Sequence, residues 1–88
     1  MALDTVHNYY ERLVFNEIKD LYTDSEEFDE HQLADMACIA LNRIAPRYIR
    51  HDIDMSFYMS SDEHYEISKR VEKAVKKAYK IITSSDKN

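Results

Sequence analysis

The chain contains no glycine and only one proline, Pro46, among its 88 residues. Many tight β-hairpin turns need a positive φ angle, which glycine adopts far more easily than other residues. The absence of glycine therefore argues against an all-β fold and favours helices. A chain of this length fits one domain. Its isolated core is expected to be marginal, so association with a second copy would stabilise it.

Helix-start signals predict where the first two helices lie. The first helix is expected over about residues 5–22, with Asp4 as its N-cap. The second is expected over about residues 30–44, because Asp29 and the glutamine three residues later match a capping box. This helix should end before Pro46, since proline disfavours helical backbone at the residue that precedes it.

The apolar residues of segment 47–59 alternate with polar ones, which favours an extended or irregular segment. A strand there has no expected partner in the chain, so it would pair with a second copy or lie against the helices. A short helix is the alternative. The last helix is expected over about residues 61–84, because Ser60 and Glu63 match a second capping box.

The first predicted helix is apolar around more of its circumference than one buried face requires. Such a helix usually packs on two sides, and in so short a chain the second side is expected to be another copy. The alternative is that its tyrosine hydroxyls face water. The sequence thus predicts a mostly α-helical single domain of three main helices, with a short extended segment after the second, assembled as a homodimer.

The net charge of -5 is unevenly distributed along the chain. Residues 1–66 hold fifteen acidic and five basic residues, whereas residues 67–88 hold two acidic and seven basic residues. The acidic body would repel phosphate, so direct DNA binding is not expected. The lysine face of the last helix is interpreted as a solvated surface, or alternatively as a contact for an acidic segment.

Two features bear on where the protein works. The N-terminal residues have neither the cationic nor the apolar region of a signal peptide, and no apolar run reaches the length of a membrane span. The single cysteine, Cys38, fits a reducing compartment, and we expect it to be a small buried residue. The protein is therefore expected to be cytoplasmic, without contact to a membrane.

The sequence offers no catalytic or metal-binding pattern. Without glycine, phosphate-cradling loops are excluded, and no nucleophile–base spacing is visible. Asp52 and Asp54, next to His51, could serve a metal or acid–base site, but we interpret them as a charged edge, with Asp52 bonded to Arg50 or Arg47. The scattered histidines do not suggest converging ligands. No catalytic residue, metal site or cofactor is expected.

Three arginines and a tyrosine gather around Pro46. Arginine binds phosphate oxygens with two parallel hydrogen bonds and stacks on base planes, so Arg43, Arg47 and Arg50 form a candidate anion site. The alternative is structural. Arg43 would complement the helix dipole while the other two arginines pair with nearby aspartates.

The stretch DMACIALNRIAPRY, residues 35–48, resembles the signature of the ComFB, or late competence development, family. The family core reads A-L-N, then lysine or arginine, a hydrophobic residue, two prolines, lysine or arginine, and tyrosine. The opening NYYERLV, residues 8–14, also resembles the start of that domain. One departure is Ala45, which replaces the first proline. Another is the lack of the cysteine cluster that binds zinc in some members, so zinc is not carried over.

The resemblance implies a dimeric regulatory protein without enzymatic activity. Members of the family bind cyclic dinucleotides, cyclic di-GMP in particular, and link that signal to motility, pili or competence. The motif positions make ligand-site candidates of Asn42, Arg43, Arg47 and Tyr48, to which the anion-site argument adds Arg50. We expect a cyclic-dinucleotide receptor that contacts an unknown protein partner. The alternative is a protein–protein adaptor that binds no small molecule.

Overall fold

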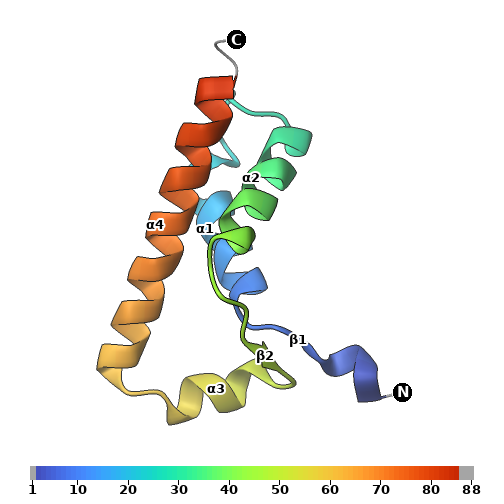
Figure 1. Cartoon of the computed structure of the whole chain (residues 1–88), viewed down its shortest axis with the longest axis vertical. Coiled ribbons are helices and arrows are strands. Elements are labelled where there is room, and N and C mark those ends of the chain that lie inside the picture. Colours follow the sequence, from blue (N-terminus) through green and yellow to red (C-terminus); the bar gives the residue numbers. More distant parts are fainter. Residues whose placement is uncertain (1, 86–88) are drawn as a thin grey trace.

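The computed structural model describes residues 2–85, and Figure 1 shows three long helices packed side by side above a short helix and a two-stranded ribbon. A 3₁₀ helix, η1, precedes them. In chain order the elements are η1 (Ala2–Thr5), β1 (His7–Asn8), α1 (Tyr10–Tyr22), α2 (Glu30–Asn42), β2 (Tyr48–Ile49), α3 (Asp52–Tyr58) and α4 (Ser61–Ser85). The prediction of a mostly helical single domain with three main helices is confirmed. The predicted homodimer remains a prediction.

The core lies where the three long helices meet. Helix α4 packs along α2, and α1 lies against both (Figure 1). Each helix contributes its apolar stripe, and the largest fully buried side chains are Val14 of α1, Met36 of α2 and Val75 of α4. On α4 the buried residues recur at helical spacing: Ile67, Val71, Ala74, Val75 and Ala78.

Both predicted starts of the later helices are confirmed. The Asp29 carboxylate accepts a hydrogen bond from the Gln32 amide at 2.8 Å, and the Gln32 side chain accepts one from the Asp29 amide at 3.0 Å. Before α4, the Ser60 hydroxyl accepts a hydrogen bond from the Glu63 amide at 3.2 Å. Each bond satisfies an amide that has no partner within its own helix.

The expected burial of Cys38 is wrong, because its side chain is exposed. The buried positions of α2 are Met36, Ala37 and Ala40. Cys38 directly follows one of them but lies outside the stripe, since one residue along a helix turns the side chain by about 100°.

The predicted start of the first helix, over about 5–22 with Asp4 as N-cap, is wrong. The chain forms η1 first, then a short strand, and α1 begins only at Tyr10. Strand β1 pairs with β2 in antiparallel register, His7 opposite Ile49 and Asn8 opposite Tyr48. Pairing with a segment forty residues away therefore overrides the local helical pattern at residues 5–9.

The structure of segment 47–59 also differs from the extended conformation that the alternation of apolar and polar residues predicted. Only Tyr48–Ile49 is a strand, and it pairs with β1 of its own chain, so it needs no second copy. The short helix left open as the alternative is present as α3 (Asp52–Tyr58). Its apolar residues are spaced both two and four apart, so a helix can pack Met55 and the following Met59 against the core.

The buried side chain of Asn8 joins the two ends of the ribbon. Its Oδ1 accepts hydrogen bonds from the amide of Tyr10 at 3.2 Å and from the amide of Arg47 at 3.0 Å. The amide of Tyr9 donates to the Arg47 carbonyl at 2.7 Å. One amide group thus supports the start of α1 and fixes the chain beyond Pro46.

No helix among residues 2–85 combines the length and the apolar composition needed to cross a membrane.

Replacing Asn8 by Ala should destabilise the protein by about 1–3 kcal/mol, because two partly enclosed backbone amides lose their acceptor. The free energy of unfolding from urea denaturation measures this loss. Asn16→Ala is the matched control, since Asn16 is an exposed asparagine in α1. Equal, small effects of both substitutions would contradict the role assigned to Asn8.

Candidate functional site

A hollow of about 450 Å³ lies between β2, α3 and the first turn of α4. Its floor is apolar, and charged side chains stand around it. The lining residues are Arg47, Ile49, Arg50, His51, Asp54, Met55, Tyr58, Met59 and Glu63. We call this hollow the arginine pocket. Its volume lies within the range of roughly 300–1,000 Å³ that is usual for small-molecule sites.

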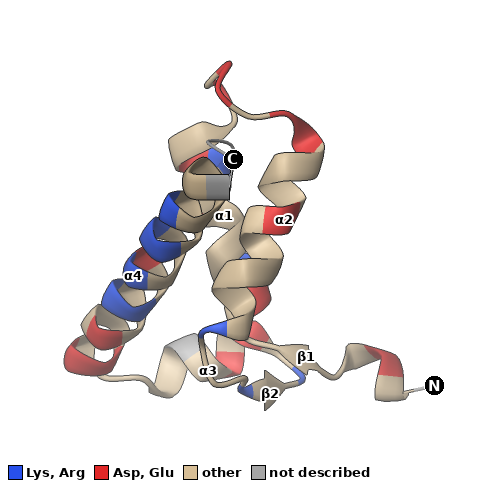
Figure 2. Cartoon of the chain, turned by 45° about the horizontal axis from the view of Figure 1, so that its top comes forward, with Lys and Arg blue, Asp and Glu red and all other residues tan. Residues whose placement is uncertain are grey.

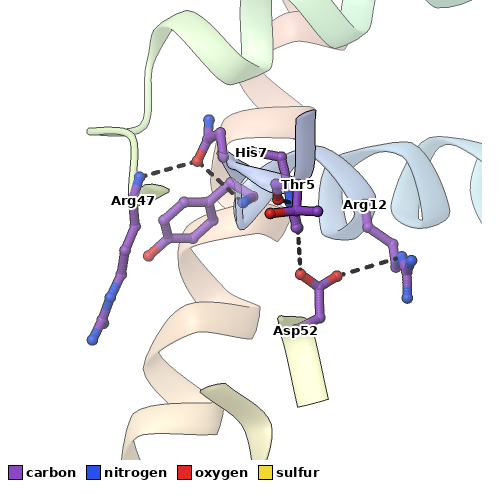
Figure 3. Close-up of polar contacts among 7 residues, drawn as sticks. Thr5, His7, Arg12, Arg47 and Asp52 are labelled. Carbon is purple, nitrogen blue, oxygen red and sulfur yellow. Dashed lines mark hydrogen bonds and ion pairs between the residues drawn. The ribbon is translucent and has the colours of Figure 1, made fainter. Parts of the chain in front are cut away.

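Two arginines of the pocket are positioned from the N-terminal segment. The backbone of Arg47 is held on both sides. Its amide donates to Asn8 (Figure 3), and its carbonyl accepts from the amide of Tyr9. The Arg47 side chain is exposed. Arg50 donates a hydrogen bond from Nε to the hydroxyl of Thr5 at 3.1 Å. This bond uses one donor and leaves the other four guanidinium N–H groups for a ligand.

The structure divides the five candidates predicted from the sequence. Arg47 and Arg50 line the arginine pocket together. Tyr48 is exposed in β2, where successive side chains point to opposite faces, so the pocket receives Ile49 and not Tyr48. Asn42 and Arg43 are exposed at the end of α2 and lie outside the pocket lining.

The Asn42 side chain has a local partner. Its amide nitrogen donates to the carbonyl of Cys38 at 2.9 Å, one turn earlier in α2. Arg43 is the C-cap residue of the same helix, which is the position expected for a cation that complements the helix dipole. Within one copy of the chain these two residues form the end of α2.

Sequence reasoning missed several residues of the pocket. His51, Tyr58 and Glu63 were not predicted as ligand-site residues, and Asp54 was interpreted as part of a charged edge. These residues lie close to the two arginines only because α3 is helical. The alternation of apolar and polar residues in the sequence concealed this helix. The signal that could have found them is the spacing of Asp54 and Tyr58, four residues apart and therefore on one face of a helix.

The predicted pairing of Asp52 with Arg50 or Arg47 is wrong. Asp52 accepts a hydrogen bond from His7 Nε2 at 2.5 Å, and its second oxygen lies 3.6 Å from Arg12 Nε (Figure 3). The other ring nitrogen of His7, Nδ1, lies 2.7 Å from the carbonyl of Thr5 and donates to it. The start of α3 is therefore bound to β1 and α1, which leaves Arg47 and Arg50 free of this carboxylate.

Both ring nitrogens of His7 face oxygen acceptors, an arrangement that suits the doubly protonated ring. The hydrogen bond to Asp52 raises the pKa of His7, with a further contribution from the Thr5 carbonyl. Through its contact with Asp52, His7 holds the first turn of α3, and with it one wall of the arginine pocket.

Among residues 2–85, no three His, Cys, Asp or Glu side chains are grouped so that they could hold a metal ion. The polar groups that line the arginine pocket are guanidinium, imidazole, phenol and carboxylate groups. Two guanidinium groups beside an apolar floor can bind a phosphate-bearing ligand with a flat ring system.

The His7–Asp52 contact should make stability depend on pH. Because the folded-state pKa of His7 is raised, its contribution is complete below the unfolded-state pKa and is lost as the pH rises through the folded-state value. The stability lost in His7→Ala should therefore be larger at about pH 6 than at about pH 8. Urea denaturation of both proteins across this range measures the difference.

Asp52→Asn is the control for this pH dependence, because it removes the acceptor charge and keeps the shape of the side chain. In the Asp52→Asn protein, the effect of His7→Ala should change much less with pH. A loss that grows as the pH rises would contradict the assignment.

Comparison with known proteins gives one match. The family model described as late competence development protein ComFB matches residues 7–86. No curated protein and no solved structure matches the chain. The family match spans β1 to the end of α4 and confirms the resemblance seen in the ALNRIAPRY stretch. It indicates a competence-related regulator, and the chain belongs to the ComFB family.

Proposed function

We propose that this protein is a non-enzymatic receptor for a cyclic dinucleotide, with cyclic di-GMP as the favoured ligand. In this role it passes the signal to a protein partner that regulates motility, pili or competence. The observation that carries the proposal is the arginine pocket, in which Arg47 and Arg50 flank an apolar floor. Family membership supports the regulatory role.

The pocket chemistry fits the two parts of such a ligand. Each guanidinium can donate two parallel hydrogen bonds to a phosphate. Tyr58 offers an exposed ring on which a base can stack, and Met55 and Met59 extend the apolar surface beneath it. Charge-assisted bonds would supply affinity, while the ring and thioethers would hold the base plane.

The two carboxylates of the pocket favour guanine over adenine. Asp54 and Glu63 would repel phosphates, so in a nucleotide site they belong beside the base. Guanine presents two adjacent donors, N1–H and the N2 amino group, which a carboxylate can accept together. Adenine lacks this pair. This complementarity supports cyclic di-GMP rather than cyclic di-AMP as the ligand.

We also propose that the receptor is a homodimer, since a two-fold symmetric ligand suits a two-fold symmetric assembly. Phe15 of α1 is 43% exposed, and it borders a hollow of about 540 Å³ that Leu33, Ala34 and Ala37 of α2 also line. The small alanines permit a second helix to approach closely. A second apolar side on the first helix is what the sequence analysis expected, and exposed Phe15 supports this part of the proposal.

A protein–protein adaptor is the second candidate function, and α3 favours it. Ile53 is 76% exposed and Phe57 is 80% exposed, one helical turn apart on this short helix. Contiguous exposed apolar side chains commonly mark a surface that binds another protein. An adaptor would use this surface without a small-molecule ligand.

Calorimetric titration with cyclic di-GMP and cyclic di-AMP tests the receptor directly. Arg47→Ala and Arg50→Ala should each weaken binding of cyclic di-GMP by about 10-fold to 100-fold, because each removes a charge-assisted contact to phosphate. Their thermal stability should stay close to that of the unmodified protein, since both side chains are exposed.

Lys76→Ala is the matched control, because it removes an exposed positive charge on α4, outside the arginine pocket. Its affinity for cyclic di-GMP should be unchanged. If the unmodified protein gives neither heat of binding nor a rise in melting temperature with either dinucleotide, the receptor proposal fails and the adaptor is preferred.

The homodimer is tested by light scattering at micromolar concentration, where the unmodified protein should have twice the mass of one chain. Phe15→Glu should shift the mass toward the monomer, because burial of an unpaired carboxylate costs several kcal/mol. Leu3→Glu, at an exposed position of η1, is the control for the added charge. A monomeric unmodified protein would contradict the dimer.

A further inference from the structure

A second surface, separate from the arginine pocket, lies between the end of α1 and the middle of α4. It is a groove of about 630 Å³ whose apolar part comes from Leu21 and Tyr22. Its α4 side carries Lys69, Lys73 and Lys76. We call it the basic groove. The arginine pocket lies instead beside α3 and the first turn of α4, and Figure 1 shows α3 next to the N-terminal end of that helix.

The apolar part of the basic groove is held rigidly. The Tyr22 ring stacks on the Tyr79 ring with centroids 5.4 Å apart and an interplanar angle of 14°. It also meets the edge of Phe28, with centroids 5.7 Å apart. Leu21 is 54% exposed beside it. A preformed apolar surface of this kind binds a partner side chain at little cost in ordering.

The lysines form a row along one side of α4, because their spacings of four and three residues place them on one face (Figure 2). Lys69 is already engaged, since its ammonium lies 3.5 Å from Glu72 and 5.4 Å from the centre of the Tyr65 ring. Within residues 2–85, neither Lys73 nor Lys76 forms an ion pair. These two lysines can form ion pairs with carboxylates of another molecule.

We propose that the basic groove docks an acidic, amphipathic helix of another protein, through an apolar residue on Leu21 and Tyr22 and carboxylates on Lys73 and Lys76. The receptor proposal requires a protein partner, and this surface indicates the chemistry of that partner. The partner's apolar side chain would cover the exposed Leu21, and its acidic flank would complement the lysine row. Opposite charges would also speed the encounter.

Nucleic acid fits the groove less well than an acidic helix does. Glu17 and Glu72 line the same groove and would repel a phosphate backbone. Burial raises the pKa of Glu17, with contributions from the nearby Glu72 and Asp20 carboxylates. An amphipathic helix can place apolar atoms against Glu17 while the carboxylates of the helix lie at Lys73 and Lys76. A phosphate backbone, in contrast, carries a charge at every repeat.

The test uses a designed peptide as the probe. It is a fluorescein-labelled helical peptide with Leu along one face and Glu on the flanking positions, measured by fluorescence anisotropy with the full chain. A scrambled peptide of identical composition is the first control, and a single-stranded DNA oligonucleotide is the second. The unmodified protein should bind the designed peptide at least about 10-fold more tightly than either control.

Two double variants separate the groove from general charge. Lys73→Glu with Lys76→Glu should weaken peptide binding by about 10-fold or more, and Leu21→Ala should weaken it by about threefold or more. Lys77→Glu with Lys80→Glu changes the net charge equally on the same helix but outside the groove lining, and should have a much smaller effect.

Equal losses in the two double variants, no preference for the amphipathic peptide over its scramble, or tighter binding of the oligonucleotide would each overturn the proposal. Far-ultraviolet circular dichroism is the check that each variant remains folded. Calorimetry with cyclic di-GMP on the same variants tests the receptor proposal separately from the docking proposal. The lysine substitutions should leave the affinity for cyclic di-GMP unchanged, whether or not the peptide binds.

Discussion

The arrangement of this small protein depends on one buried amide. Asn8 accepts hydrogen bonds from the backbone of Tyr10 and of Arg47, so a single side chain starts α1 and fixes the segment that follows α2. Without glycine, the chain has few residues that adopt unusual backbone angles easily, and no described residue has a positive φ. Side-chain hydrogen bonds from Asn8, Asp29 and Ser60 stabilise the starts of α1, α2 and α4.

This constraint links the core to the surface that we propose binds the ligand. The three long helices bury their apolar stripes against each other, and their ends determine where the connecting segments lie. Asn8 holds the backbone of Arg47, Thr5 accepts from Arg50, and His7 binds Asp52 at the start of α3. The N-terminal segment, residues 2–8, thus positions most of the arginine pocket. The basic groove depends instead on the contact of α1 with α4.

Local chemistry predicted the parts of the fold that local contacts determine. The capping pattern at Asp29 located α2 because the bonds join residues three apart in the sequence. Residues 5–9 were mispredicted because they depend on pairing between β1 and β2, which no local pattern reveals. In segment 47–59 the two-residue alternation favoured an extended segment, and the helix α3 was only the alternative. The same limit applied to the site. Arg47 and Arg50 were found from their chemistry, whereas His51 and Tyr58 join them only through the turn of α3.

The most direct test of the account is a ¹H–¹⁵N NMR titration of the full chain with cyclic di-GMP, which reports the position of the ligand residue by residue. The account predicts that the largest amide shifts occur at Arg47, Arg50 and His51 and along α3. Shifts concentrated at Asn42 and Arg43 would place the ligand at the end of α2, outside the arginine pocket. Absence of any shift at saturating ligand would contradict the receptor proposal itself.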